Sequence, residues 1–206
     1  MGGAAAGLAL LAAGCARGPA ADAQLSAILD RLSTDLLRES PETATSLGVS
    51  EAQAGGRYID KLTDPSREAL ARTRGIYQHA LVDLRALHRD ALSETDRVSL
   101  DVVTASLDDN IADIAFEPSA RYPYQITQLS GSYINIPDFL ASQHPITSRE
   151  EVEAYMSRLS AYAHVLDTDT ALITSDSQRG ITLPDFALDR TIEQQQGFAS
   201  TAPAQT

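Results

Sequence analysis

The sequence contains little lysine, histidine or cysteine, and these shortages exclude several kinds of site. Lys61 is the only lysine among 16 basic residues, and neither glycine nor serine flanks it, so a phosphate-binding Gly-Lys-Ser/Thr loop is absent. Cys15 is the only cysteine, which excludes an internal disulfide and a Cys-x-x-Cys site. The four histidines lie at least nine positions apart, whereas helical metal ligands lie three or four apart. The sequence therefore predicts no catalytic residue, no metal ligand and no cofactor in this chain.

Basic residues are also scarce relative to acidic ones. The chain has 28 acidic and 16 basic residues, which gives a formal net charge of −12. A nucleic acid is therefore not expected as a partner, because binding to phosphates requires a basic surface. The 206 residues, with 43% hydrophobic and 21% charged side chains, are typical of one globular domain with a processed leader.

The first fifteen residues have the composition of a secretory signal. Residues 1–14 carry no charged side chain, and residues 4–13 are small and apolar but too few to span a bilayer. The run ends in Leu-Ala-Ala-Gly-Cys, which resembles the lipobox of bacterial lipoproteins, where the cysteine thiol receives a diacylglycerol. We therefore expect residues 1–15 to be a lipoprotein-type signal peptide, with lipidation of Cys15 and a flexible tether over residues 16–23. The alternative is an alanine-rich leader with an incidental cysteine.

This interpretation places the protein in the bacterial cell envelope. The lipid chains on Cys15 would be its only attachment to a membrane, on the periplasmic side. Ala16, rather than aspartate, follows the cysteine, which favours the outer membrane over the inner membrane.

Beyond residue 23 the apolar residues recur at helical spacing. No segment alternates with a period of two, and no Asn-Gly or Asp-Gly turn is present. The predicted fold class is therefore all-α, an antiparallel helical bundle over residues 24–200 followed by a disordered end at 201–206. The expected apolar stripes are Leu25, Ile28, Leu29, Leu32 and Leu36; Leu70, Tyr77, Leu81 and Leu84, with His88; Leu100, Val103, Leu107, Ile111 and Ile114; and Val152, Tyr155, Leu159, Tyr162 and Leu166.

Helix boundaries are marked by capping residues. Ser40-Pro41 and Asp64-Pro65 each predict a helix start, and Gly48 predicts the end of the first of these two helices. Ser93 with Asp96, and Thr147 and Ser148 with Glu150 and Glu151, resemble capping boxes. A last helix is expected from near Pro184 to just before Gly197.

The helical pattern lapses over about residues 116–147, where we expect one long, aromatic-rich irregular loop. Five of the chain's eleven phenylalanines and tyrosines fall in this segment. It is either a packed connecting loop or one wall of a cleft that binds an extended peptide. His144 is expected to be a hydrogen-bonded loop residue. The candidate wall residues are Tyr122, Tyr124, Gln125, Gln128, Tyr133 and His144.

Several short motifs, in order, resemble the N-terminal part of a bacterial family known as domain of unknown function 885. The likeness covers about residues 24–200. Its motifs are Pro-Glu-Thr-Ala-Thr-Ser-Leu-Gly at 41–48, Leu-Ser-Glu-Thr-Asp-Arg at 92–97, Gln-Leu-Ser-Gly at 128–131, Ile-Pro-Asp-Phe-Leu at 136–140, His-Pro at 144–145 and Gly-Ile-Thr-Leu-Pro at 180–184.

This resemblance implies a larger, mostly helical lipoprotein of the zinc-metallopeptidase type. In such proteins a His-Glu helix of the C-terminal half would bind zinc, and none of those positions exists in this chain. The chain is then the N-terminal, non-catalytic helical portion, inactive alone, and its partner is the missing C-terminal catalytic region. The alternative is a self-contained, lipid-anchored helical module that binds a peptide or another envelope component.

Overall fold

The computed structural model describes residues 18–115 and 124–200. These residues form seven α-helices and one 3-10 helix, and no strand is assigned among them, which confirms the all-α prediction. The elements are α1 (Gly18–Glu39), α2 (Pro41–Leu47), α3 (Arg67–Arg85), η1 (Arg89–Ala91), α4 (Glu94–Ala115), α5 (Ser132–Ser142), α6 (Arg149–Gln178) and α7 (Asp185–Ser200).

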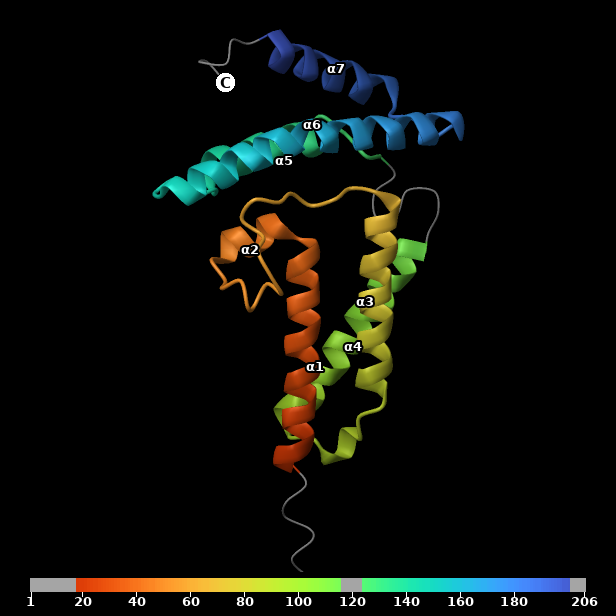
Figure 1. The fold of residues 1–206 in the computed structure, drawn as a ribbon. Helices are drawn as coiled ribbons and strands as arrows, with labels where there is room; N and C mark the ends of the chain where they lie inside the picture. Colours follow the sequence, from red (N-terminus) through yellow and green to blue (C-terminus); the bar gives the residue numbers. More distant parts are fainter. Residues whose placement is uncertain (1–17, 116–123, 201–206) are drawn as a thin grey trace, which may run out of the picture.

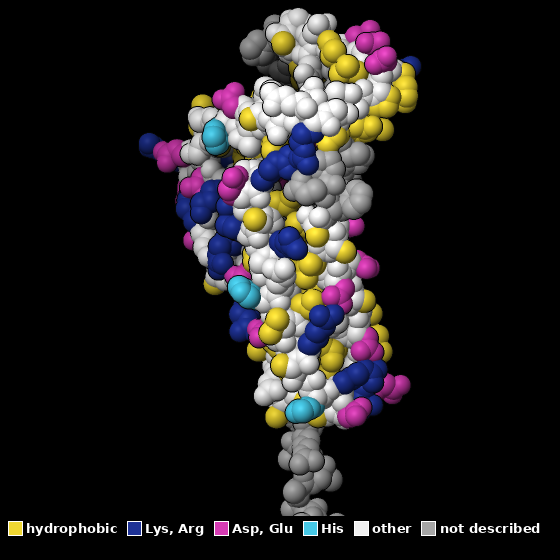
Figure 2. All heavy atoms as spheres, turned by 90° about the vertical axis from the view of Figure 1, so that its right-hand side faces the viewer, with side chains coloured by type: hydrophobic (Ala, Val, Ile, Leu, Met, Phe, Trp, Pro, Cys, Tyr) yellow, Lys and Arg dark blue, Asp and Glu magenta, His cyan; other side chains and the backbone are white. Residues whose placement is uncertain are grey.

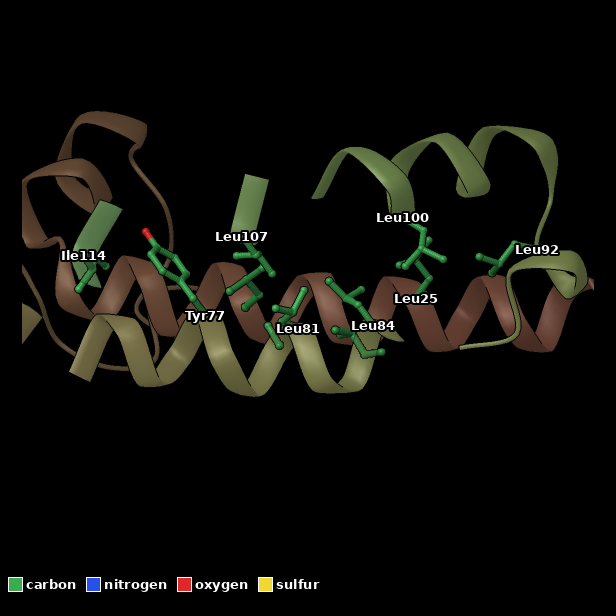
Figure 3. Close-up of a cluster of buried hydrophobic side chains, with 11 residues drawn as sticks. Leu25, Tyr77, Leu81, Leu84, Leu92, Leu100, Leu107 and Ile114 are labelled. Carbon is green, nitrogen blue, oxygen red and sulfur yellow. The ribbon is translucent and has the colours of Figure 1, made fainter. Parts of the chain in front are cut away.

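Helices α1, α3 and α4 form an antiparallel bundle, as the short connections predicted (Figure 1). Their apolar stripes meet in one core that includes Leu25, Leu84 and Leu100 (Figure 3). Leu84 and Leu25 are 0% and 1% exposed. Burial of each such side chain contributes about 1.5–3 kcal/mol, so this core accounts for the position of the three helices.

Helices α5, α6 and α7 form a second layer that crosses the end of the bundle where α1 ends and α3 begins (Figure 1). This layer has its own small core of Ile136, Phe139, Leu140 and Val165. Leu62, in the connection between α2 and α3, packs against the same core. The expected bundle is therefore confirmed for α1, α3 and α4, whereas α5–α7 lie across it.

Helix α5 corrects the predicted loop over residues 116–147. Its buried side chains Tyr133, Ile136 and Phe139 have the three-residue spacing of one helical face. Pro137 lies inside the helix and cannot donate a hydrogen bond to the carbonyl of Tyr133. The Tyr162 hydroxyl donates to that carbonyl instead, at 3.4 Å. Tertiary contacts therefore support a helix that proline obscures in the sequence.

Three other predicted boundaries are also wrong, one of them the end of the last helix, because α7 continues past Gly197 to Ser200. Helix α1 begins at Gly18, so residues 18–23 are helical and are not part of a flexible tether. Helix α3 begins at Arg67 rather than at Asp64-Pro65, because Ser66 caps it by accepting from the Ala69 amide. Gly48 does end α2, in the left-handed conformation with φ of 61° that glycine tolerates best.

The capping box at the start of α6 is confirmed and makes stability depend on pH. The Thr147 hydroxyl, then the amides of Thr147 and Ser148, donate to Glu151, which lowers the pKa of its carboxyl despite the opposing effect of burial. Because the folded pKa is depressed, the stabilisation is complete above the unfolded pKa of about 4.3 and is lost as pH falls through the folded value.

Glu151→Gln is therefore expected to lower the melting temperature more at pH 7 than at pH 3. Glutamine keeps an acceptor oxygen but lacks the charge that strengthens these hydrogen bonds. Thermal unfolding of both proteins across this pH range measures the effect, with the exposed Glu153→Gln as control. An equal difference at both pH values would contradict the assignment.

Candidate functional site

The buried face of helix α6 carries three polar side chains beside apolar ones, and several large apolar side chains of the same helix are exposed. Arg158 and Asp169 are 0% and 1% exposed. Only part of the predicted apolar stripe is buried, because Tyr155 and Tyr162 pack against the core around Val165 whereas Val152 and Leu159 are 46% and 44% exposed. The buried side chains of α6 lie against backbone carbonyls and charged groups of other segments. Buried groups of this kind require hydrogen-bonding partners, so polar side chains are favoured on this face.

Arg158 is the centre of a buried network that joins α6 to the chain around α2. Among the described residues its guanidinium donates only to neutral acceptors, and it stacks over the Phe139 ring with Cζ 4.8 Å from the ring centroid. Burial lowers the pKa of Arg158, while the charges of Glu42 and Asp60 act in the opposite direction. An arginine nevertheless stays protonated. The five acceptors are Lys61 O at 2.8 Å, His144 Nδ1 at 2.6 Å, Thr45 Oγ1 at 2.7 Å, Tyr58 O at 3.2 Å and Pro41 O at 3.4 Å.

His144 belongs to this network. Its ring is 7% exposed and packs edge-on against Tyr155. Because Nδ1 accepts from Arg158, the proton of the neutral ring lies on Nε2, which donates to the Glu151 carbonyl at 2.9 Å. The prediction of a hydrogen-bonded loop histidine is confirmed, and the ring contacts structural partners.

Further along α6, Asp169 and Asp176 face the end of the bundle. The Gln125 amide donates to Oδ1 of Asp169 at 2.8 Å, while Oδ2 has no hydrogen-bond partner among the residues that are described. Burial, and then the negative charge of Asp169, raise the pKa of Tyr162. Asp176 forms an ion pair with Arg67 at 2.8 Å, and this pair joins α6 to the start of α3.

A cavity of about 600 Å³ lies between the two layers. Its wall combines the end of α1, the start of α3 and the segment at Tyr124 and Gln125 with Leu172 and Asp176 of α6. Most polar lining residues are hydroxyls, among them Ser33, Ser40, Thr43, Thr63, Ser66 and Thr73. Its volume is within the usual range of pockets for small ligands.

A second cavity of about 300 Å³ lies between α6 and α7. Tyr124, Gln125 and Asp176 line both cavities and therefore separate them. The remaining wall is mostly aliphatic and comprises Ile126, Ile173, Ile181, Leu183, Leu188 and Ile192.

The structure brings together only some of the predicted cleft residues. Tyr124 and Gln125 line the cavities, and Tyr122 lies outside the described residues. Tyr133 is buried, and its hydroxyl contacts the Thr127 carbonyl and Gln194. Gln128 lines neither of these two cavities, and neither does His144, which contacts Arg158 instead.

The sequence reasoning missed the three buried polar residues of α6. Arg158, Asp169 and Asp176 lie at spacings of eleven and seven, which place them on one helical face. That polar register is visible in the sequence. The apolar stripe beside it predicts a different buried face, because apolar periodicity is normally the stronger signal.

Large apolar side chains are exposed on α6 and α7. Figure 2 shows hydrophobic side chains on the surface of the end of the molecule where these helices lie. We define the α6–α7 face by its exposed apolar residues, which are 38–75% accessible: Val152, Met156, Leu159, Ile173, Phe186, Leu188, Ile192 and Phe198. Large apolar side chains exposed in such numbers are typical of an interaction surface.

The described residues do not provide the zinc site that the family resemblance implies for a full-length protein. Over residues 18–115 and 124–200, no three histidine, cysteine, aspartate or glutamate side chains are arranged to hold a metal. No helix in the same part of the chain is long and apolar enough to cross a membrane. Cys15 and the predicted signal peptide lie outside the described residues.

One solved structure resembles this fold closely. It is the crystal structure of "the putative lipoprotein from Colwellia psychrerythraea", with a TM-score of 0.76 and 19% sequence identity. The match covers 88% of this chain but 32% of that protein, so the chain spans about a third of its length. At this identity the likeness shows a common fold only.

The sequence comparisons identify the family. No curated protein sequence matches the chain. The model of the family described as "Bacterial protein of unknown function (DUF885)" matches residues 41–206, which include every helix from α2 to α7. The chain therefore belongs to the DUF885 family of bacterial proteins.

Proposed function

We propose that this chain is the helical, non-catalytic N-terminal region of a larger envelope lipoprotein of the zinc-metallopeptidase type. In this proposal the α6–α7 face packs against a C-terminal region that binds the metal, and the lipid on Cys15 anchors the protein. The zinc and the peptidase activity come from the family resemblance alone.

The observation that carries the proposal is an exposed apolar stripe on α6. Val152, Met156 and Leu159 follow one another at spacings of four and three, so they form a stripe on one helical face. All three are 44–55% exposed. The solved protein with this fold has about two thirds of its chain outside the match, and that length of chain could cover such a face.

The proposal can be tested in the crystal structure of the Colwellia psychrerythraea protein. We expect the helices that superimpose on α6 and α7 to be covered by residues outside the matched third. Val98 and Val102 of α4, which are 57% and 61% exposed, provide a control face that should stay open. An open α6–α7 face in that structure would refute the packing proposal.

The isolated chain provides a second test. Replacing both Met156 and Leu159 by glutamine is expected to reduce self-association and binding of an apolar dye. It should change the free energy of unfolding by no more than about 0.5 kcal/mol, because exposed side chains contribute little to the core. The matched control replaces Val98 and Val102 on α4. A large loss of stability would mean that the face is already packed within this chain.

The alternative proposal is a self-contained binding module. The cavity of about 600 Å³ favours it, because Tyr124 and Gln125 line that cavity as the cleft hypothesis requires. This alternative predicts that the chain without its leader unfolds cooperatively and binds peptides. The first proposal predicts that the chain alone cleaves no peptide and retains no stoichiometric zinc, which metal analysis and a protease assay would measure.

A further inference from the structure

We propose that the cavity between α6 and α7 is a receptor pocket for one large apolar side chain, of leucine or phenylalanine size. The side chain would come from the C-terminal region that packs on the α6–α7 face, so this inference rests on the proposed function. It adds the chemistry of the partner: a polypeptide segment with a protruding apolar residue.

The size of the cavity fits one side chain. Its volume is about 300 Å³. A cavity of about 150 Å³ lined by aliphatic side chains can hold benzene, so this cavity accommodates a phenylalanine or leucine side chain with its first backbone atoms. The apolar part of the wall is isoleucine and leucine from α6, α7, the connection between them and the segment before α5.

Three polar groups in the wall have partners within the chain. The Thr191 hydroxyl donates to the Ala187 carbonyl at 2.8 Å, and the Gln125 amide donates to Asp169. Asp176 is paired with Arg67. Because these groups need no hydrogen bond from a ligand, the pocket favours an apolar occupant. The other polar lining residues are Ser177, Thr182 and Gln195, which are exposed to solvent, and Tyr124, which is half-buried.

The pocket is continuous with the exposed face. Ile173, Leu188 and Ile192 line the cavity and are also 38–43% exposed. A segment that covers the face would therefore reach the cavity with one of its side chains. Interfaces commonly concentrate their binding energy in such an anchor residue within a pocket.

Charge favours a side chain over a free fatty acid, the other common apolar ligand. A fatty acid would bring a carboxylate next to Asp176 and into a chain with a net charge of −12. A side chain within a polypeptide brings no charge to this position, so like-charge repulsion does not oppose its binding.

The test uses N-acetyl amino acid amides as probes of the full chain. Titrations of N-acetyl-phenylalanine amide and N-acetyl-leucine amide, followed by methyl NMR, should shift the signals of Ile173, Leu188 and Ile192. We expect affinities about tenfold higher than for N-acetyl-alanine amide, because apolar pockets discriminate missing methylenes by such factors. Tighter binding of decanoate than of the phenylalanine probe would overturn the inference.

A pair of matched variants locates the binding. Ile192→Phe should fill the cavity and weaken binding of the phenylalanine probe by about tenfold. Leu159→Phe adds a ring at an equally exposed position that does not line the cavity, and it should leave binding unchanged. Leu188→Phe repeats the filling test if Ile192→Phe does not fold. Equal binding to the filled and control variants would refute the pocket.

The two proposals fail in different ways. If the superposition shows the α6–α7 face covered while the probes do not bind, only the pocket inference is wrong. If the probes bind to the pocket but the face is open in the larger protein, the packing proposal is wrong, and so is the inference that its C-terminal region supplies the side chain.

Discussion

Arg158→Met is expected to lower the free energy of unfolding by about 3–5 kcal/mol. Methionine fills much of the same volume but donates no hydrogen bond, so Lys61 O, Tyr58 O and His144 Nδ1 lose their buried donor. Each buried polar group without a partner costs about 1–3 kcal/mol. Urea unfolding monitored by circular dichroism measures the difference.

Two controls separate the network from the loss of charge. Arg149→Met removes an arginine from the same helix whose side chain is 92% exposed, and it should change stability by less than about 0.5 kcal/mol. Arg158→Lys keeps the charge but lacks the planar fork that reaches acceptors on both sides, so it should also destabilise the protein clearly. If Arg158→Met unfolds at the same urea concentration as the wild type, the network does not stabilise the fold.

Leu84→Ala is expected to lower the free energy of unfolding by about 3–5 kcal/mol. Leu84 is fully buried in the core of the bundle, between α3 and the two other bundle helices (Figure 3). Alanine removes apolar contacts and leaves a cavity that helices from three parts of the chain cannot close without moving. Thermal or urea unfolding gives the value.

Val82→Ala is the matched control on the same helix. Val82 is 68% exposed, so its truncation should change stability by no more than about 0.5 kcal/mol. Similar effects at the two positions would mean that the bundle core is not centred on Leu84.

The sequence predicted those helices whose apolar spacing and capping residues agree. The stripes of α1, α3 and α4 form the core, Ser148 caps the start of α6, and Gly48 ends α2 as expected. Caps and helical stripes depend on residues within about four positions of one another, so they can be predicted from a single sequence. Helix α5 was missed because Pro137 argues locally against a helix, and only the distant Tyr162 relieves its unpaired carbonyl.

The candidate site was less predictable. Tyr124 and Gln125 were singled out by composition and do line the cavities. Arg158 shares a helical register with Asp169 and Asp176, but the sequence does not indicate that this face is buried, because the acceptors of Arg158 lie 14 to 117 positions away. The buried face of α6 was misassigned for a similar reason. Which face of α6 is buried depends on the surface at the end of the bundle, against which the helix packs.

By itself, the sequence determined an acidic, lysine-poor, all-α chain of the DUF885 type without a cysteine pair or a helical histidine pair. The tertiary structure alone decided that α5–α7 cross the bundle and that α6 buries Arg158, Asp169 and Asp176. It also decided that Val152, Met156 and Leu159 of α6 stay exposed. The physical reason is the range of the interactions: caps and periodicity act within a turn or two, whereas burial depends on which distant segments meet.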